Sequence, residues 1–198
     1  MPKKIDHELR KERILKTALD VFAREGYKDS NLSLIAQECG LSRPTIYQYF
    51  KDKEQIYYYA VKLVTGRMFK KYADYAWASD DNVMDRIIYI CNDIIDFGVT
   101  HLSELTSLVD VMLLMRKEGT NFNTIILRRT AKLNILFKRL LRYGRGRGDI
   151  SADCDIEGIT EHISSLVVSS SLEFAFLGIE NPKINKDLIS RYLSFYKI

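Results

Sequence analysis

Cysteine clusters and disulfide patterns are missing from this sequence of 198 residues. It holds three cysteines, Cys39, Cys91 and Cys154, which lie far apart, with no CxxC pair and no histidine at ligand spacing. This spacing favours neither a disulfide framework nor a zinc site, so we expect no metal and no cofactor. Unpaired cysteines are typical of a reducing compartment, and we therefore expect a cytoplasmic protein.

Long apolar runs are missing as well. The longest stretch without Asp, Glu, Lys or Arg is 11 residues, from His162 to Leu172, whereas a membrane-spanning helix needs about 20 apolar residues. The first residues, MPKKIDHELRKERIL, are too charged for a signal peptide. The sequence therefore predicts a protein without a membrane partner.

Proline is equally scarce, and its positions permit long helices. Pro2, Pro44 and Pro182 all fall at expected starts or links, and no sustained strand alternation competes with the helical periodicity. We therefore predict an all-α fold. The stretch RYGRGRGD, from Arg142 to Asp149, is the one expected flexible, basic link. In the larger part of the chain, helices are expected near residues 53–76, 83–100, 103–117, 121–144, 155–178 and 185–197.

Catalytic patterns are the last class of absence. No paired carboxylates, Ser/His/Asp arrangement, Cys/His site or phosphate loop stands out, so we expect no enzyme activity. The run GRGRG, from Gly144 to Gly148, lacks the GK[ST] ending and the preceding strand of a P-loop.

What the sequence does contain is a pattern for two short helices that cross at a tight turn, in residues 32–49, LSLIAQECGLSRPTIYQY. Ala36 is small where the second helix must cross close by, and Gly40 occupies the bend, where a positive φ costs glycine almost nothing. The pattern predicts a DNA-binding helix-turn-helix, whose second helix keeps its register in a major groove. Its small core would be formed by Ile35, Cys39, Leu41, Ile46 and Tyr49.

The flanking residues mark where these helices begin. Asn31 is a good N-cap for the first helix and Ser42 for the second. Upstream, an apolar stripe predicts one amphipathic helix that Gly26 ends. A further helix opens at Lys53, which completes a compact module. The upstream stripe consists of Ile14, Ala18, Leu19, Phe22 and Ala23.

Charge is distributed unevenly between this module and the rest. The formal net charge is only +4, but residues 1–71 hold 15 Lys and Arg against 9 Asp and Glu, whereas residues 72–198 hold 15 against 17. Positive charge therefore concentrates on the module that would face phosphates, as the electrostatic part of DNA binding requires.

The segment ILKTALDVFAREGYKDSNLSLIAQECGLSRPTIYQYFKDKEQI resembles the N-terminal domain of the tetracycline-repressor (TetR) family of bacterial transcription regulators. The resemblance covers about the first 65 residues. It depends on GY at Gly26, IA at Ile35, GLS at Gly40 and the run TIYQYFKDKE from Thr45. A second, local similarity is GDISADCDIE, from Gly148, which is similar to the turn that often precedes the dimerising helices of the family.

The resemblance implies an all-helical protein of two parts. Residues 1–54 are expected to form the three-helix DNA-binding domain, and residues 55–198 a helical domain for effector binding and dimerisation. The helix that begins at Lys53 would connect them. The implied function is that of a ligand-responsive transcription regulator, most commonly a repressor, which binds a pseudo-palindromic DNA operator as a homodimer.

Candidate DNA contacts follow from residue type and from the positions that match the family. Arg43 and Gln48 have the donor geometry to read guanine and adenine edges. The resemblance implies contacts to phosphates or a thymine methyl for Thr45, Tyr47 and Tyr49, although a tyrosine here can also pack. Pro44 departs from the glycine more common there, which leaves the operator sequence open. The predicted DNA-binding residues are Asn31, Ser33, Ser42, Arg43, Thr45, Tyr47, Gln48, Tyr49 and Lys53.

The last two predicted helices are the natural dimer interface, because each has an apolar stripe and could pack against its symmetry mate as a four-helix arrangement. The alternative is that both stripes only fill the core of the monomer. The predicted interface residues are Ile163, Leu166, Val167, Ser170, Phe174, Leu177, Leu188, Ile189, Tyr192 and Tyr196, with Leu193 on the same stripe.

The middle helices hold polar, aromatic and soft side chains suited to lining a cavity for an unknown small-molecule effector. For each, an ordinary core or surface role is the alternative. The corresponding alternative function is a DNA-bound structural or protein-recruiting dimer that answers to no small ligand. The candidate effector-binding residues are Tyr89, Asp93, His101, Met112, Met115, Asn134, Phe137 and His162.

Overall fold

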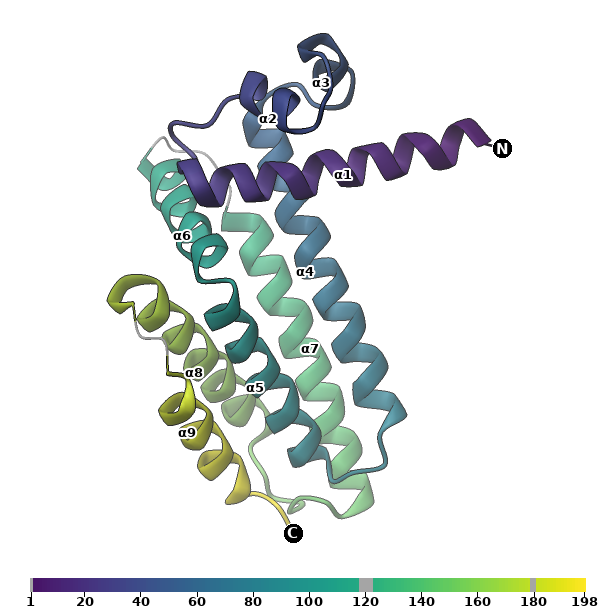
Figure 1. Cartoon of the computed structure of the whole chain (residues 1–198). Coiled ribbons are helices and arrows are strands. Elements are labelled where there is room, and N and C mark those ends of the chain that lie inside the picture. The colour runs from purple at the N-terminus through teal and green to yellow at the C-terminus, as the bar shows by residue number, and fades with distance from the viewer. Residues whose placement is uncertain (1, 118–122, 179–180) are drawn as a thin grey trace. The chain divides into compact units, whose positions relative to one another are not determined.

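The computed structural model of the chain describes residues 2–117, 123–178 and 181–198, and within these ranges it has nine α-helices (Figure 1). The described residues contain no strand, and a single antiparallel bridge joins Ile150 to Lys197. The all-α prediction is confirmed. The helices are α1 (Pro2–Glu25), α2 (Leu32–Glu38), α3 (Arg43–Tyr49), α4 (Lys53–Ala78), α5 (Val83–Thr100), α6 (Leu102–Lys117), α7 (Asn123–Arg147), α8 (Ile156–Leu177) and α9 (Lys183–Ser194).

Helix ends fall where the sequence places capping residues. Gly26 follows α1 with φ of 79° and Gly178 follows α8 with φ of 63°, a left-handed conformation that other residues adopt only with strain. At the start of α8, the Asp155 side chain accepts a hydrogen bond from the Gly158 amide at 3.0 Å. Such caps satisfy backbone groups that the helix itself leaves unpaired.

The prediction of a flexible link at Arg142–Asp149 is wrong. Helix α7 continues through this stretch to Arg147, and only Gly148, with φ of 81°, ends it. Gly144 is buried inside the helix, where a Cβ atom would lie 2.1 Å from Cγ2 of Val83. The glycine is there because α5 approaches closely, and not because the backbone is irregular.

The chain divides into two compact units. The head unit comprises Met1–Gly66 with Thr106–Ile125, and the body unit comprises Arg67–Leu105 with Ile126–Ile198. Helices α4, α6 and α7 each contribute residues to both units.

The core of the head unit is built around three aromatic rings. Phe22 of α1, Tyr27 of the following loop and Tyr57 of α4 lie with their ring centroids 5.2–5.4 Å apart. Burial raises the pKa of the Tyr57 hydroxyl, beside which lies Ser107 of α6. The Ser107 hydroxyl also donates a hydrogen bond to the Phe22 carbonyl at 3.4 Å. These contacts join α1, α4 and the later part of α6 around one interior.

The core of the body unit is formed by apolar faces of α5, α7, α8 and α9 and the end of α4. Arg86 of α5 is only 2% exposed and fastens the end of α4 to this core. Its Nε donates to the Asp81 carbonyl at 2.8 Å, and its Nη1 donates to the Ala76 carbonyl at 3.0 Å. The largest buried apolar side chains include Met84, Ile87, Ile90, Ile95, Phe137, Leu140, Ile163, Phe174, Ile189 and Leu193.

Within the described ranges, no single helix is long and apolar enough to cross a membrane. One bent pair, Val83–Thr100 with Leu102–Leu114, meets that test by length and composition alone.

Candidate nucleic-acid interface

The helix-turn-helix is held by a small apolar core between α2 and α3. Ile35, Cys39 and Ile46 are at most 1% exposed, and burial raises the pKa of the Cys39 thiol. The bend at Gly40 has φ of 63°, as the sequence predicts. Phe50, which follows α3, is 1% exposed and belongs to the same core, although the sequence pattern did not single it out.

Both predicted N-caps are confirmed. The Asn31 side chain accepts a hydrogen bond from the Leu34 amide at 3.0 Å. The Ser42 hydroxyl accepts from the Thr45 amide at 3.3 Å and lies 2.8 Å from the Thr45 hydroxyl. These polar groups therefore fix the start of each helix in addition to any contact with DNA.

The outer face of α3 carries side chains that the fold does not use. Arg43 and Gln48 are exposed, and the Tyr47 side chain is 49% exposed. The Arg43 guanidinium lies 5.8 Å from the centroid of the Tyr47 ring. Ser33 on α2 is exposed as well. A planar donor, an amide and a phenol thus stand together on one short, rigid helix.

Lys53, one of the predicted DNA-binding residues, forms its hydrogen bonds within the head unit. Its ammonium group donates to the carbonyls of Tyr27, Lys28 and Ser30 at 2.8, 3.1 and 3.2 Å. It also lies 4.5 Å from the centroid of the Tyr27 ring. An ammonium has three protons, so these carbonyls account for all of its donors. The contact fastens the loop between α1 and α2 to the first turn of α4.

Two arginines of α1 contact the C-terminal end of α2. Arg13 donates to the Cys39 carbonyl, the C-cap of α2. Arg24 forms an ion pair with Glu38 at 2.9 Å, near the end of the same helix. Helices α1 and α2, which pack next to the recognition helix α3, are therefore held together both by apolar burial and by hydrogen bonds.

Half of the ten predicted dimer residues are buried inside the body unit. Leu166, Tyr192 and Tyr196 are partly buried, whereas Leu177 and Leu188 are 70% and 52% exposed. For the fully buried members, the alternative of a monomer core describes the structure, because the protein's own helices cover them. Those members, at most 7% exposed, are Ile163, Val167, Ser170, Phe174 and Ile189, with Leu193 of the same stripe.

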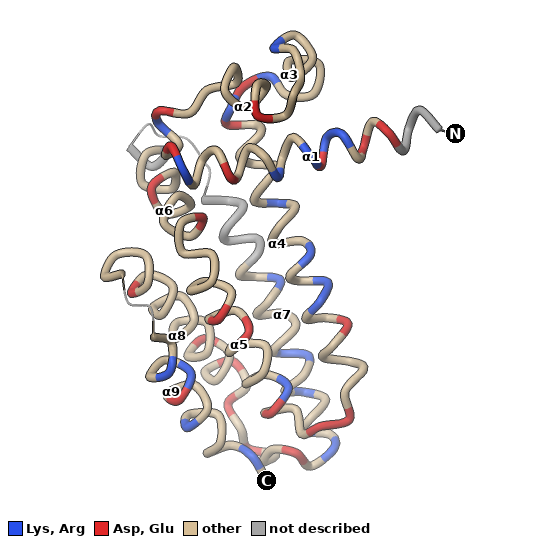
Figure 2. The backbone as a smooth tube through the Cα atoms, in the orientation of Figure 1, with Lys and Arg blue, Asp and Glu red and all other residues tan. Residues whose placement is uncertain are grey.

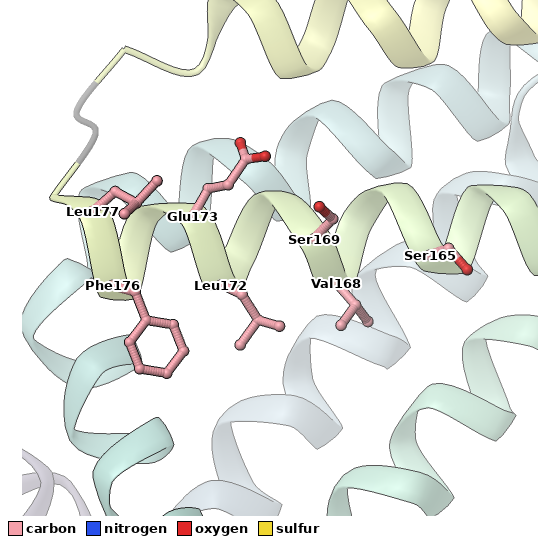
Figure 3. A pocket seen from close by; sticks show the side chains of 7 residues that line it. All are labelled: Ser165, Val168, Ser169, Leu172, Glu173, Phe176 and Leu177. Atoms are coloured by element: carbon pink, nitrogen blue, oxygen red, sulfur yellow. The ribbon is translucent and has the colours of Figure 1, made fainter.

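A different face of α8 is open and apolar. Figure 3 shows Val168, Leu172 and Phe176 projecting from one side of the helix, with exposed fractions of 47%, 42% and 61%. Together with four neighbours they line a shallow groove of about 490 Å³. On α9, Ile184 and Leu188 are also exposed. The neighbours in the groove are Ser165, Ser169, Glu173 and Leu177.

The candidate effector residues are divided between the two units, and those of the body unit have different contacts. Tyr89 stacks on Tyr75 at a centroid distance of 4.2 Å, and Asp93 accepts hydrogen bonds from Lys71 and Tyr72 at 2.7 and 2.8 Å. Met112 belongs to the head unit, and the Met115 side chain lies outside the described residues.

The remaining candidates on α7 and α8 have partners in their own unit. Phe137 is fully buried in the core, and Asn134 accepts a hydrogen bond from Ser164. His162 is exposed, and its Nδ1 lies 2.9 Å from the Gly158 carbonyl.

Three side-chain polar atoms on α5 and at its end are buried without a hydrogen-bond partner. They are Nη2 of Arg86, Oδ1 of Asn92 and Nδ1 of His101. The His101 ring stacks on Phe97 at a centroid distance of 4.1 Å. Buried polar atoms are normally paired, and these three could each form a further hydrogen bond. His101 was a candidate from the sequence, whereas Asn92 had no signal beyond being a polar residue in an apolar helix.

Basic residues are concentrated on particular helices. Helix α7 carries eight Lys and Arg and no Asp or Glu, and Figure 2 shows basic residues along it and along α4. Part of the α7 charge is balanced by Glu157 of α8, which pairs with Lys138 and Arg142. Among the described residues, no group of three or more His, Cys, Asp or Glu could hold a metal ion.

Comparisons with known proteins find a family match over the same helices. The model of the family described as "Bacterial regulatory proteins, tetR family" matches residues 14–59, from α1 into α4. This part of the chain therefore matches the N-terminal domain of that family. It is similar to the uncharacterized HTH-type transcriptional regulator YerO of Bacillus subtilis (strain 168), with 37% identity over 62 residues, which are 31% of this chain and 22% of that relative. The chain thus spans about a fifth of the length of that relative.

Solved structures extend the likeness to the whole fold. A TetR transcription regulator from Haloarcula marismortui has a TM-score of 0.85 at 14% identity, covering 96% of this chain and 100% of that one. The transcriptional regulator FadR from Bacillus subtilis, solved in complex with stearoyl-CoA, has a TM-score of 0.74 at 18% identity, covering 91% and 96%. At these identities the likeness concerns the fold alone.

Proposed function

We propose that this protein is a transcription regulator, most commonly a repressor in its family, that binds double-stranded DNA in the cytoplasm. The observation that carries the proposal is the exposed face of α3, where Arg43, Tyr47 and Gln48 stand free on a helix fixed by Ser42 and a buried core. A rigid helix with free polar side chains is what base recognition in a major groove requires.

The roles of the individual side chains follow from their chemistry. Arg43 and Gln48 read base edges, whereas Tyr47, Ser33 and Thr45 contact phosphates or a thymine methyl. Asn31, Ser42 and Tyr49 orient the two helices and line the edge of the same surface. Lys53 reaches a phosphate only by exchanging one of its three carbonyl partners, so its main contribution is to hold the loop between α1 and α2.

We further propose that the functional form is a homodimer joined through the open face of α8 and α9. Val168, Leu172 and Phe176 form an exposed apolar stripe, and Ser165 and Ser169 leave room for a second helix to approach. Leu177 and Leu188 from the predicted interface continue it. Two heads double the number of base contacts, so a pseudo-palindromic operator is expected.

A small-molecule effector is the finer part of the proposal. FadR from Bacillus subtilis was solved with stearoyl-CoA, and this chain has the same fold. The unpaired atoms of Asn92 and His101 support an apolar ligand with a polar group, bound in the body unit. Such a ligand regulates DNA binding only if it prefers one of two conformations of the protein.

Selection of bound DNA from a random pool tests the central proposal. We expect an inverted repeat, because two identical heads read two half-sites. A single unrepeated motif would contradict the dimer, and no enrichment at low ionic strength would contradict DNA binding itself. In a thermal melt, stabilisation by stearoyl-CoA or a related acyl-CoA would support the effector, whereas a protein-recruiting dimer would show no such shift.

A further inference from the structure

The first turns of α1 pack against the end of the recognition helix. The ring of His7 lies 4.4 Å, centroid to centroid, from the ring of Tyr49, the last residue of α3, at an interplanar angle of 32°. One turn later, the Lys11 ammonium lies 4.8 Å from the Tyr59 ring centroid and 6.0 Å from that of Phe50. Residues four apart share one face of a helix, so His7 and Lys11 together hold the end of α3.

The α1 side of this contact, His7 and Lys11, lies outside the segment that the family model matches. The match begins at residue 14, whereas α1 begins at Pro2 and has 24 residues. At 1.5 Å per residue such a helix is about 36 Å long. Figure 1 shows that its first turns extend beyond α2 and α3. His7 is exposed and Tyr49 is partly buried, so the histidine ring covers one side of Tyr49 and keeps its own other face open.

We propose that His7 is a positioning residue for DNA binding. Its ring holds Tyr49 at the edge of the interface, and its protonated form adds a positive charge where a phosphate passes. The inference rests on the DNA-binding function proposed above. It adds a contact from a part of α1 that the helix-turn-helix pattern does not include.

Protonation is the property that separates this role from simple packing. Among the residues whose side chains the structure describes, the charged or titratable groups in contact with His7 or within four positions of it are Tyr49 from α3 and Asp6, Glu8, Arg10 and Lys11 from α1. Arg10 pairs with Asp6 at 3.5 Å. Histidine is the side chain that ordinarily changes charge near neutral pH, and the other two histidines, His101 and His162, belong to the body unit. Because a phosphate attracts positive charge, we expect DNA binding to tighten as pH falls.

The test uses the full chain and a duplex that the wild type recovers from a random pool. Affinity is measured at about pH 7.5 and about pH 5.5 for the wild type and for His7→Ala, His7→Phe and Leu9→Ala. Leu9 is the control, because it is 63% exposed two residues along the same helix. Thermal melts of all four proteins establish that the fold is kept.

We expect His7→Ala to weaken binding about 3- to 10-fold at the higher pH, since an aromatic pair of this kind contributes on that scale. His7→Phe keeps the stack, so its affinity at the higher pH stays within about twofold of wild type. The wild type and Leu9→Ala gain affinity in acid, whereas His7→Phe and His7→Ala lose most of that gain. A stack that only stabilised the fold would leave the acid gain in place.

The outcomes separate this inference from the proposed function. A wild type that binds no duplex overturns both. A wild type that binds DNA while His7→Ala matches it, or while His7→Phe weakens as much as His7→Ala, overturns only the positioning role. An acid gain that persists in His7→Phe assigns the titrating charge elsewhere and also overturns the inference.

Discussion

The helix-turn-helix and the last two helices both carry apolar side chains at helical spacing, but the two regions use them differently. In α2 and α3 there are only enough apolar residues for one small core, and Ile35 and Ile46 fill it. In α8 the apolar residues cover more than one side, so Val167 and Phe174 lie inside while Leu172 and Phe176 face out. A short helix with one apolar stripe can bury only that stripe. A long helix with two apolar stripes can bury either of them in the core of the protomer.

The largest expected effect comes from the core of the head unit. Phe50→Ala should lower the free energy of unfolding by about 3–5 kcal/mol, because it empties a fully buried aromatic site. Tyr47→Ala, at a half-exposed position on the same helix pair, should change it by at most about 0.5 kcal/mol. Chemical denaturation of both variants measures the difference. Similar losses for the two would mean that the recognition helix is not held by this core.

The open face of α8 should matter for assembly and not for folding of the protomer. Leu172→Asp combined with Phe176→Asp should convert the proposed dimer to a monomer, because charges in an apolar interface lose their hydration. DNA affinity should then fall at least about 100-fold, or about 2.7 kcal/mol. Sedimentation and DNA titration check the two results. The control, Trp77→Asp, changes another half-exposed apolar residue of the body unit and should remain a dimer.

The end of α7 offers a matched pair of glycines. Gly144→Ala should destabilise the protein by about 1–3 kcal/mol, because the new Cβ would overlap Val83. Gly146→Ala meets nothing within 4 Å and should stabilise the helix by up to about 1 kcal/mol. Thermal melts distinguish the signs. If both substitutions were harmless, the close packing of α5 on α7 would be contradicted.

The smallest expected effect concerns sequence reading by the recognition helix. Gln48→Ala should relax the preference at one base pair of each half-site by about 1–3 kcal/mol, and leave binding to other positions unchanged. A panel of operators with single base substitutions measures this. Unchanged discrimination across the panel would remove Gln48 from base recognition.

Much of the head could be predicted because its signals are local. Asn31, Ser42, Gly26 and Gly40 act on the backbone within a few residues of themselves, and the structure gives each the role that the sequence indicates. The contacts that local sequence patterns did not reveal are those between residues far apart in the sequence. Lys53 meets carbonyls some 25 residues earlier in the chain, and His7 meets Tyr49.

The body unit could be predicted only as a set of helices. Helix α5 begins and ends at the expected residues, because Asn82 caps it and its apolar periodicity is strong. The glycines of α7 indicated a break, yet Gly144 serves close packing against Val83, which no neighbour in sequence reveals. The candidate effector residues were chosen by chemistry alone, and the structure distributes them over different surroundings.

The sequence by itself determined most of the helices, their caps and the match of residues 14–59 to the tetR family, because each of these depends on residues within a few positions of one another. Tertiary structure alone decided which stripe of α8 is buried and which is open, which carbonyls hold Lys53 and which aromatic ring covers Tyr49. These features depend on which segments, distant in sequence, pack against one another. The spacing of neighbouring residues does not reveal that packing.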